Sequence, residues 1–257
     1  MPNSENAPKT DLVEEAQRIL EFAGKKNIVL RLLGGVAVKM HCPTYDYLFK
    51  DMGRKIPDID LVTYNQYHKE VGKMFTELGY EEDRMIRRLY FGKRLIFYDH
   101  PNNRHLDIFV DKLKMCHEID FRGRLEIDYP TTSLVDIFLS KMQVVQLNER
   151  DVIDTIVLLR EHEIGNNDKE TINSEYLAKL CANDWGLWKT ITINLEKVKN
   201  LLNKYEALTE TDKQDVLAKI DKLLDTMEKE PKSTKWRWRN MIGEKKQWYN
   251  DVEEVVR

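Results

Sequence analysis

Two segments, Gly34–Met40 (GGVAVKM) and Pro57–Val62 (PDIDLV), decide the fold of this chain. A short apolar run at residues 28–33 precedes the first segment. Its branched side chains and the glycine pair that follows predict a buried strand, a tight turn and a helix. Gly34 and Gly35 at such a turn allow backbone N–H groups to approach an anion closely. Many strand-to-helix corners carry two glycines, so this segment alone assigns no function.

The second segment predicts a strand over residues 56–64 that carries two aspartates. Side chains alternate along a strand, so Asp58 and Asp60 share one face while Ile59 and Leu61 point to the other. Neighbouring carboxylates repel each other unless a cation lies between them, and ligands that are all oxygen favour Mg²⁺ or Mn²⁺. The simpler alternative is a pair of solvated aspartates at a strand edge.

A third carboxylate strengthens the metal hypothesis. Residues 105–111 alternate as a further strand, with Asp107 on the same face as His105 and Phe109. Two glycines, an Asp-x-Asp strand and a lone aspartate in a later apolar strand resemble the polymerase-beta-like nucleotidyltransferases. The resemblance is greatest to the branch that holds the AbiEii-type toxins and related antibiotic nucleotidyltransferases.

The resemblance extends over roughly residues 12–165. In that branch the first motif reads approximately Gly-Gly-x-Ala and then Arg-x-x-x-Asp-Ile-Asp-Leu, which Ala37 and Arg54 match. The long spacing between Gly35 and Asp58 implies an inserted loop at about residues 43–55.

The resemblance also implies the organisation of the chain. We expect an α+β fold, with a mixed sheet and flanking helices forming a nucleotidyltransferase domain over residues 11–164. A polar stretch at 164–169 predicts a domain boundary. Helical periodicity beyond it predicts a C-terminal helical bundle over residues 170–257, and residues 1–10 are expected to be a flexible tail.

Between the aspartate strands the sequence predicts a hairpin over residues 90–98. An antiparallel pairing of Leu95–Tyr98 with Leu106–Val110 would place Asp107 near the centre of the sheet. The basic side chains of this region are expected mostly to face solvent, with a triphosphate as the alternative ligand; they are Arg87, Arg88, Lys93 and Arg94.

A predicted strand at residues 125–129 leads to a predicted helix at 134–147, on whose apolar face Lys141 lies. A lysine there must reach solvent, pair with a carboxylate or bind a ligand phosphate. The toxin branch has a lysine on this helix, followed by an Arg-x-x-Asp helix, which the Lys141 and Asp151 region resembles. Asp151 is alternatively a helix N-terminal carboxylate with a purely structural role.

The resemblance assigns roles to these residues. It implies that Asp58, Asp60 and Asp107 are catalytic and bind two Mg²⁺ or Mn²⁺ ions, with Asp107 on the acceptor side. It further implies a nucleoside triphosphate, for example ATP, bound by a second set of residues: Gly34, Gly35, Arg54, Lys141 and Asp151.

The implied activity is transfer of an NMP group from an NTP to an acceptor, with release of pyrophosphate. An RNA or tRNA end, an antibiotic hydroxyl and a protein side chain are all compatible acceptors, and an antitoxin is a possible partner. The alternative is a catalytically silent nucleotide- or nucleic-acid-binding protein of the same fold.

Composition limits these possibilities. Of the 257 residues, 42% are hydrophobic and 33% charged, which is typical of a globular protein. No apolar run is long enough to span a bilayer, so no membrane partner is expected. Three cysteines without CxxC spacing predict a reducing, cytoplasmic setting. The net charge of −3 argues against a surface that binds nucleic acid everywhere, but permits a local basic patch.

The segment Lys229–Tyr249 is such a candidate patch. It interleaves basic residues with Trp236, Trp238 and Trp248. Basic and aromatic side chains together bind phosphates and stack on bases, so RNA is a possible ligand of this segment. The alternative is a terminal helix whose tryptophans pack on the bundle while its lysines face water.

Overall fold

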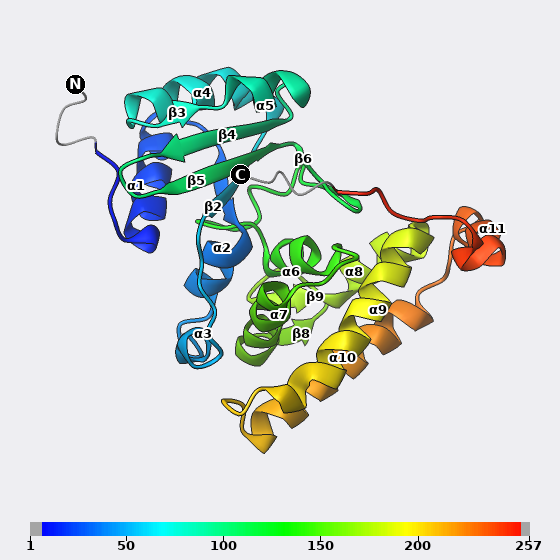
Figure 1. The fold of residues 1–257 in the computed structure, drawn as a ribbon. Coiled ribbons are helices and arrows are strands. Elements are labelled where there is room, and N and C mark those ends of the chain that lie inside the picture. Colours follow the sequence, from blue (N-terminus) through cyan, green and yellow to red (C-terminus); the bar gives the residue numbers. More distant parts are fainter. Residues whose placement is uncertain (1–6, 253–257) are drawn as a thin grey trace. The chain divides into compact units, whose positions relative to one another are not determined.

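The structure is a computed structural model that describes residues 7–252, and packing divides these into two compact units (Figure 1). Unit 1 comprises the chain up to Met40, Ile56–Leu113 and Asp120–Ser133. Unit 2 comprises His41–Lys55, Lys114–Ile119 and the chain from Leu134 onward. Within the described range, no helix is long and apolar enough to cross a membrane.

Unit 1 is built on a mixed five-stranded sheet in the order β1-β2-β5-β4-β3. Its strands are β1 (Leu30–Leu33), β2 (Ile59–Thr63), β3 (Glu81–Glu82), β4 (Arg94–Asp99) and β5 (Arg104–Val110). β2 and β5 are parallel, and the other neighbours are antiparallel. The predicted α+β class with a mixed sheet is confirmed, and so is the pairing that places Asp107 on the central strand.

Helices flank this sheet, and their apolar faces form the core of unit 1. They are α1 (Leu12–Lys25), α2 (Gly34–His41, whose last residue belongs to unit 2), α4 (His68–Glu77, after the 3₁₀ turn Asn65–Tyr67) and α5 (Arg84–Leu89). The Asp11 side chain caps α1 by accepting from two backbone N–H groups of its first turn. Phe75 of α4 stacks on Phe97 of β4 with ring centroids 4.7 Å apart, and both are fully buried.

The predicted hairpin over residues 90–98 is wrong. Asp83 caps a short helix, α5, by accepting from the N–H groups of Met85 and Ile86. The chain leaves this helix through Phe91 and Gly92, both with positive φ, so Gly92 lies in a helix-to-strand turn. The hairpin of this region instead joins β4 to β5.

The predicted strand at residues 125–129 is also wrong. The backbone turns twice here, with Arg124 N–H bonded to Phe121 O and Ile127 N–H to Arg124 O. Leu125 alone of the three alternating apolar residues is buried, whereas Ile127 and Tyr129 are exposed. An isolated bridge to β1 forms at residue 131 instead.

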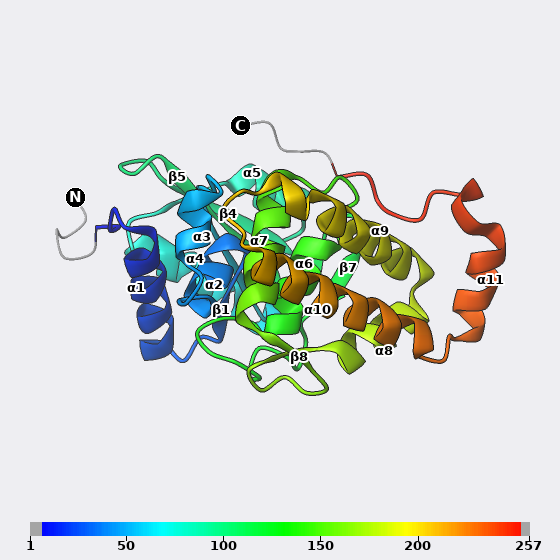
Figure 2. The same cartoon turned by 90° about the horizontal axis from the view of Figure 1, so that it is seen from below.

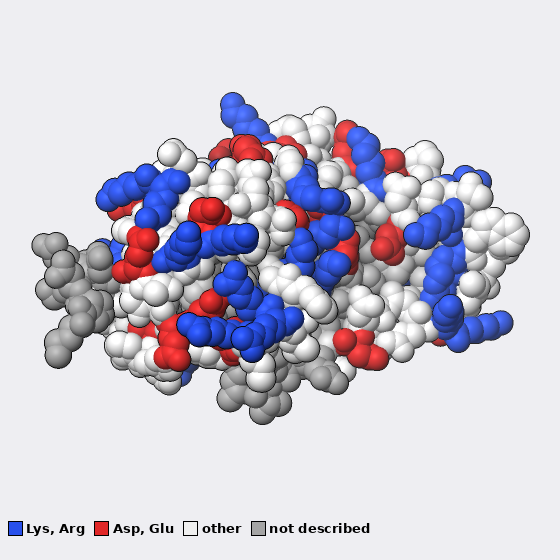
Figure 3. All heavy atoms as spheres, turned by 90° about the horizontal axis from the view of Figure 1, so that it is seen from above, with Lys and Arg blue, Asp and Glu red and all other residues white. Residues whose placement is uncertain are grey.

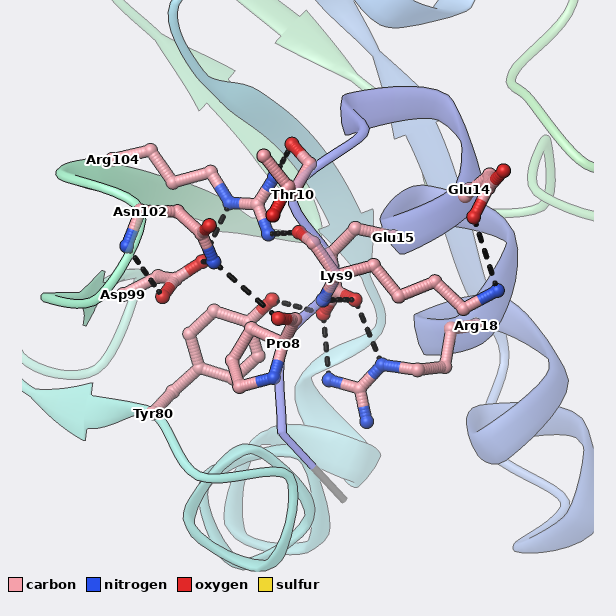
Figure 4. Close-up of polar contacts among 10 residues, drawn as sticks. All are labelled: Pro8, Lys9, Thr10, Glu14, Glu15, Arg18, Tyr80, Asp99, Asn102 and Arg104. Atoms are coloured by element: carbon pink, nitrogen blue, oxygen red, sulfur yellow. Dashed lines mark hydrogen bonds and ion pairs between the residues drawn. The ribbon is translucent and has the colours of Figure 1, made fainter. Parts of the chain in front are cut away.

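A buried polar cluster holds the segment before α1 onto unit 1 (Figure 4). Glu15 is fully buried and accepts from Arg18 Nε at 2.7 Å, from the Lys9 N–H at 2.8 Å and from the Tyr80 hydroxyl. Arg104 of β5 donates to the Lys9 carbonyl. Of the predicted flexible tail at 1–10, residues 1–6 lie outside the described residues.

Unit 2 is mainly helical, with α8, α9 and α10 packed on one another (Figure 2). Its helices are α3 (Tyr47–Asp51), α6 (Leu134–Met142), α7 (Glu149–Glu161), α8 (Ser174–Asn183), α9 (Trp185–Leu201), α10 (Glu210–Lys229) and α11 (Thr234–Ile242), with 3₁₀ turns at Leu202–Lys204 and Gly243–Lys245. The strands β8 (Glu163–Gly165) and β9 (Thr171–Asn173) pair in parallel around the polar stretch that predicts a domain boundary. The remaining two-stranded sheet, β6 (Lys112–Lys114) with β7 (Glu118–Asp120), is formed where the chain passes from unit 1 to unit 2 and back, and each strand has residues of both units.

Candidate active site

Asp60 and Asp107 lie directly opposite each other on the parallel strands β2 and β5. Side chains of register partners project from the same face of a sheet, so the two carboxylates are neighbours. Asp107 is buried, with 5% of its surface exposed, and Asp60 is partly buried. Asp58 comes just before the first residue of β2, and its Oδ2 lies 3.5 Å from Nε2 of His105. Unit 1 therefore contains all three predicted aspartates, on or beside two adjacent strands.

Gly34 closes one side of this group. It has a φ of +66°, a conformation that L side chains rarely adopt, and a Cβ built on it would overlap Oδ2 of Asp60 and lie 2.9 Å from Cγ. The residue is therefore glycine for two reasons, its backbone conformation and its approach to Asp60. Gly34 and Gly35 are buried in the first turn of α2, where backbone N–H groups lack partners within the helix.

Arg94 of β4 binds the carboxylate of Asp107. Its Nε lies 2.9 Å from Oδ1 and 3.0 Å from Oδ2, and Nη2 also donates to Oδ2. Burial by itself lowers the pKa of Arg94, but the hydrogen bonds and charge of Asp107 outweigh it, so the pKa is raised. The sequence predicts that most basic residues here face solvent, and this pair is not among its predictions. Once β4 and β5 are paired, however, Arg94 falls diagonally opposite Asp107 on the same face.

The donor set fits a hard divalent cation, because Asp58, Asp60 and Asp107 offer only carboxylate oxygens. The fit requires Asp107 to exchange Arg94 for the cation. As they lie in this structure, residues 7–252 contain no group of three or more His, Cys, Asp or Glu side chains arranged to hold a metal ion. The two-metal assignment thus stays a prediction.

The other predicted nucleotide ligands, Arg54, Lys141 and Asp151, belong to unit 2, where they gather around Asp154. Arg54 forms a bidentate pair with Asp154, with Nε–Oδ1 at 2.7 Å and Nη2–Oδ2 at 2.8 Å. Lys141 Nζ lies 2.8 Å from Asp154 Oδ2 and 3.3 Å from Asp151 Oδ1. Of the three uses expected for a lysine at this apolar position, pairing with carboxylates is the one observed.

Asp154 is the centre of this cluster, and its side chain is fully buried. Burial raises its pKa, but the charge of Lys141 and the hydrogen bonds and charge of Arg54 outweigh burial, so the pKa is lowered. Two cations face two carboxylates, so the cluster carries no excess positive charge for a phosphate. Nucleotide binding by Arg54, Lys141 and Asp151 stays a prediction, and an internal structural role competes with it.

The basic, aromatic segment at the end of unit 2 divides its tryptophans between packing and exposure. Trp236 is buried against Trp188, and Trp248 donates from Nε1 to the Thr190 hydroxyl at 3.0 Å. Trp238 of α11, in contrast, is 66% exposed. Packing therefore accounts for Trp236 and Trp248 and leaves Trp238 exposed, so RNA binding by this segment stays a prediction.

Comparisons with known proteins add no family: no protein-family model, no curated protein and no solved structure matches this chain. Its function must therefore be argued from the site itself.

Proposed function

We propose that this protein is a metal-dependent nucleotidyltransferase, which moves an NMP group from an NTP to an acceptor and releases pyrophosphate. The observation that carries the proposal is the register pairing of Asp60 with Asp107, together with the close approach of Gly34 to Asp60. A structural role alone does not require two like charges on adjacent strands beside a helix-initiating glycine. An anionic, metal-bound substrate explains both the paired carboxylates and the nearby glycine.

In this proposal, Asp58, Asp60 and Asp107 hold the divalent cations, which when bound neutralise charge on the phosphate oxygens. The N–H groups of Gly34 and Gly35 lie at the start of α2, and so donate to the triphosphate. Phosphoryl chemistry of this kind depends on positioning and electrostatic stabilisation more than on covalent catalysis. These residues act by aligning the acceptor and the phosphate chain.

In this proposal Arg94 has one role before a cation binds Asp107 and another role afterwards. In the free protein it neutralises Asp107. If Asp107 bound a cation instead, the guanidinium of Arg94 would be free to donate to a phosphate oxygen at the same site. The resemblance alone favours ATP as the triphosphate and an antitoxin as a partner. Composition alone favours a cytoplasmic location.

The second candidate is a catalytically silent nucleotide- or nucleic-acid-binding protein of the same fold. The Arg94–Asp107 pair favours it, because a permanently neutralised third carboxylate would not accept a cation. The two candidates differ in whether Mg²⁺ displaces Arg94.

Calorimetry with each of the four NTPs and Mg²⁺ tests the proposal on wild type and Asp60→Asn. We expect Mg²⁺-dependent binding that is lost in the variant, and pyrophosphate release by wild type once an acceptor is supplied. Asp120→Asn is the matched control, since it removes the same charge from an exposed carboxylate of unit 1 that pairs with Arg122. NTP binding that is the same in Asp60→Asn as in wild type would refute the site. Binding without pyrophosphate release from any acceptor would favour the silent alternative.

A further inference from the structure

Unit 1 has a second candidate binding site, a pocket between the start of α4 and α5. Its volume is about 420 Å³ and it opens to solvent. Its lining is rich in arginine and includes one exposed aromatic ring; the lining residues are His68, Glu82, Arg84, Arg87, Arg88, Phe91 and Gly92. Neither the three aspartates nor the glycine pair takes part in it.

The lining carries a net positive charge, because three arginines face a single glutamate. Arg87 Nη1 donates to Glu82 Oε1 at 2.8 Å, which balances that carboxylate. Arg84 and Arg88 are exposed, and their side chains have no ion pair or hydrogen bond with any residue in the described range. Figure 3 looks onto the side of unit 1 that carries α4 and α5, where Lys and Arg side chains gather. Two uncompensated guanidinium groups at one pocket suit an anion with more than one phosphate.

Phe91 is the second, independent indication of a ligand. It is 90% exposed and has a φ of 50°. A bulky residue in the left-handed region is a conformational outlier, which costs about 1–3 kcal/mol. Exposure and conformation both disfavour phenylalanine here, and neither folding nor the core explains it. An exposed ring beside arginines is the arrangement that stacks on an unpaired base.

We propose that this pocket, which we call the α5 pocket, binds a single-stranded nucleic acid. Arg84 and Arg88 contact successive backbone phosphates, and Phe91 stacks on a base. The exposed apolar side chains of Met85 and Leu89 on the same short helix extend the surface that faces the strand. A duplex would not present the unstacked base that Phe91 requires.

The α5 pocket lies close along the chain to the candidate active site. Gly92 lines the pocket, and Arg94, two residues later, binds Asp107. Two extended residues span at most about 7 Å. Arg94 also lies over the ring of Tyr90, with its guanidinium carbon 5.5 Å from the ring centroid. A strand held in the pocket therefore lies near Arg94, the partner of Asp107, and can reach the position where an acceptor is needed. That this nucleic acid is the acceptor rests on the proposed transfer function. Its binding to the α5 pocket does not.

Fluorescence anisotropy with a labelled short single-stranded RNA, without NTP or divalent metal, tests the α5 pocket on the full chain. We expect Arg84→Ala/Arg88→Ala to weaken binding about tenfold or more. The same variant is expected to reduce the slope of log K against log salt concentration by about 1.4, since each phosphate contact contributes about 0.7 to that slope. Phe91→Asn removes the stacking ring and is expected to weaken binding about tenfold with the salt dependence unchanged.

Lys235→Ala/Arg237→Ala is the charge-matched control. It removes two exposed positive charges from α11, the rival RNA-binding segment. The proposal predicts binding close to that of wild type for this control. Three results would overturn it: no RNA binding by wild type, loss of binding in the control instead of the pocket variant, or equal affinity for a duplex. None of these depends on whether Asp60→Asn binds NTP, so the proposed transfer function is judged separately.

Discussion

The guanidinium of Arg94 contacts both carboxylate oxygens of Asp107, from a neighbouring strand of the same sheet. Asp107 is buried and lies opposite Asp60, so Arg94 supplies positive charge beside two neighbouring carboxylates. The free protein thus has a way to hold its third carboxylate without metal. Binding of a cation must compete with this internal partner.

Arg94→Ala should make the stability of unit 1 depend on Mg²⁺. The variant leaves Asp107 buried without a cation. We expect unfolding to cost about 2 kcal/mol less than in wild type, below the roughly 3–5 kcal/mol of a fully buried pair because Arg94 is partly exposed. Mg²⁺ should restore more stability to the variant than it adds to wild type, since Asp107 is then free to bind it. Hydrogen exchange of the β2 and β5 amides measures this.

Arg122→Ala is the control for that measurement. Its partner Asp120 is exposed, and such pairs contribute less than about 1 kcal/mol because solvent screens them. The control should respond to Mg²⁺ as wild type does. If Mg²⁺ stabilised Arg94→Ala no more than wild type, Asp107 would not be a metal ligand.

Gly34→Ala should disturb Asp60 as well as the backbone. The left-handed conformation costs about 1 kcal/mol for alanine, and the new Cβ displaces the Asp60 carboxylate. We expect a total loss of about 2–3 kcal/mol in the stability of unit 1, accompanied by loss of Mg²⁺-dependent NTP affinity. Urea unfolding followed by circular dichroism, together with calorimetry, measures the two effects.

Gly123→Ala separates the two contributions. Gly123 has a φ of +73° in the same unit, but a Cβ there meets no atom within 4 Å. The Gly123→Ala variant should therefore lose only the roughly 1 kcal/mol of stability that the left-handed backbone costs alanine, and should keep its NTP affinity. In an Asp60→Ala background, Gly34→Ala should cost less than in wild type, because the overlapping carboxylate is gone. Equal costs in both backgrounds would mean that Gly34 and Asp60 do not interact.

The sequence alone predicts the aspartate strands well, and the reason is physical. Alternation at period 2 with apolar residues on the buried face leaves little freedom in register, so the pairing of β4 with β5 and the central place of Asp107 follow from it. The strand around Asp60 starts later than expected, at Ile59. Strand patterning does not determine which end of a short segment remains unpaired.

The false hairpin at residues 90–98 has a different cause. The sequence predicts a strand turn near Gly92 and Lys93, but Asp83 caps a helix that ends at Leu89, and Phe91 follows it with a positive φ. Side-chain partners were the hardest to foresee. Asp154 meets Arg54 across 100 residues of sequence, and only the folded chain shows that one carboxylate engages both Arg54 and Lys141.

Phe91→Asn should make unit 1 more stable while weakening RNA binding. Asparagine tolerates the left-handed conformation better than phenylalanine does, and the ring that is lost is exposed. We therefore expect the free energy of unfolding of unit 1 to rise by about 0.5–1 kcal/mol. Met85→Asn is the control, because Met85 is exposed on α5, a few residues before Phe91, and has no positive φ, so its substitution should change stability little. Hydrogen exchange at α5 compares the two variants. A loss of stability in Phe91→Asn would show that the ring serves the fold.

Asp154→Asn should destabilise unit 2 and remove part of its acid sensitivity. Arg54 and Lys141 would remain buried without the negative charge that both contact, so we expect a loss of about 3–5 kcal/mol at neutral pH. The folded pKa of Asp154 is lowered below its ordinary value. Its contribution is therefore complete above about pH 4, the unfolded pKa, and is lost as the pH falls through the lower folded pKa.

All five tryptophans lie in unit 2, so their fluorescence reports the unfolding of that unit. In urea titrations at several pH values, wild type should lose stability steeply below about pH 4, and Asp154→Asn should do so less. Asp120→Asn removes an exposed carboxylate of unit 1 and should leave the tryptophan transition of unit 2 unchanged at every pH. An equal acid dependence in wild type and Asp154→Asn would mean that another carboxylate governs unit 2.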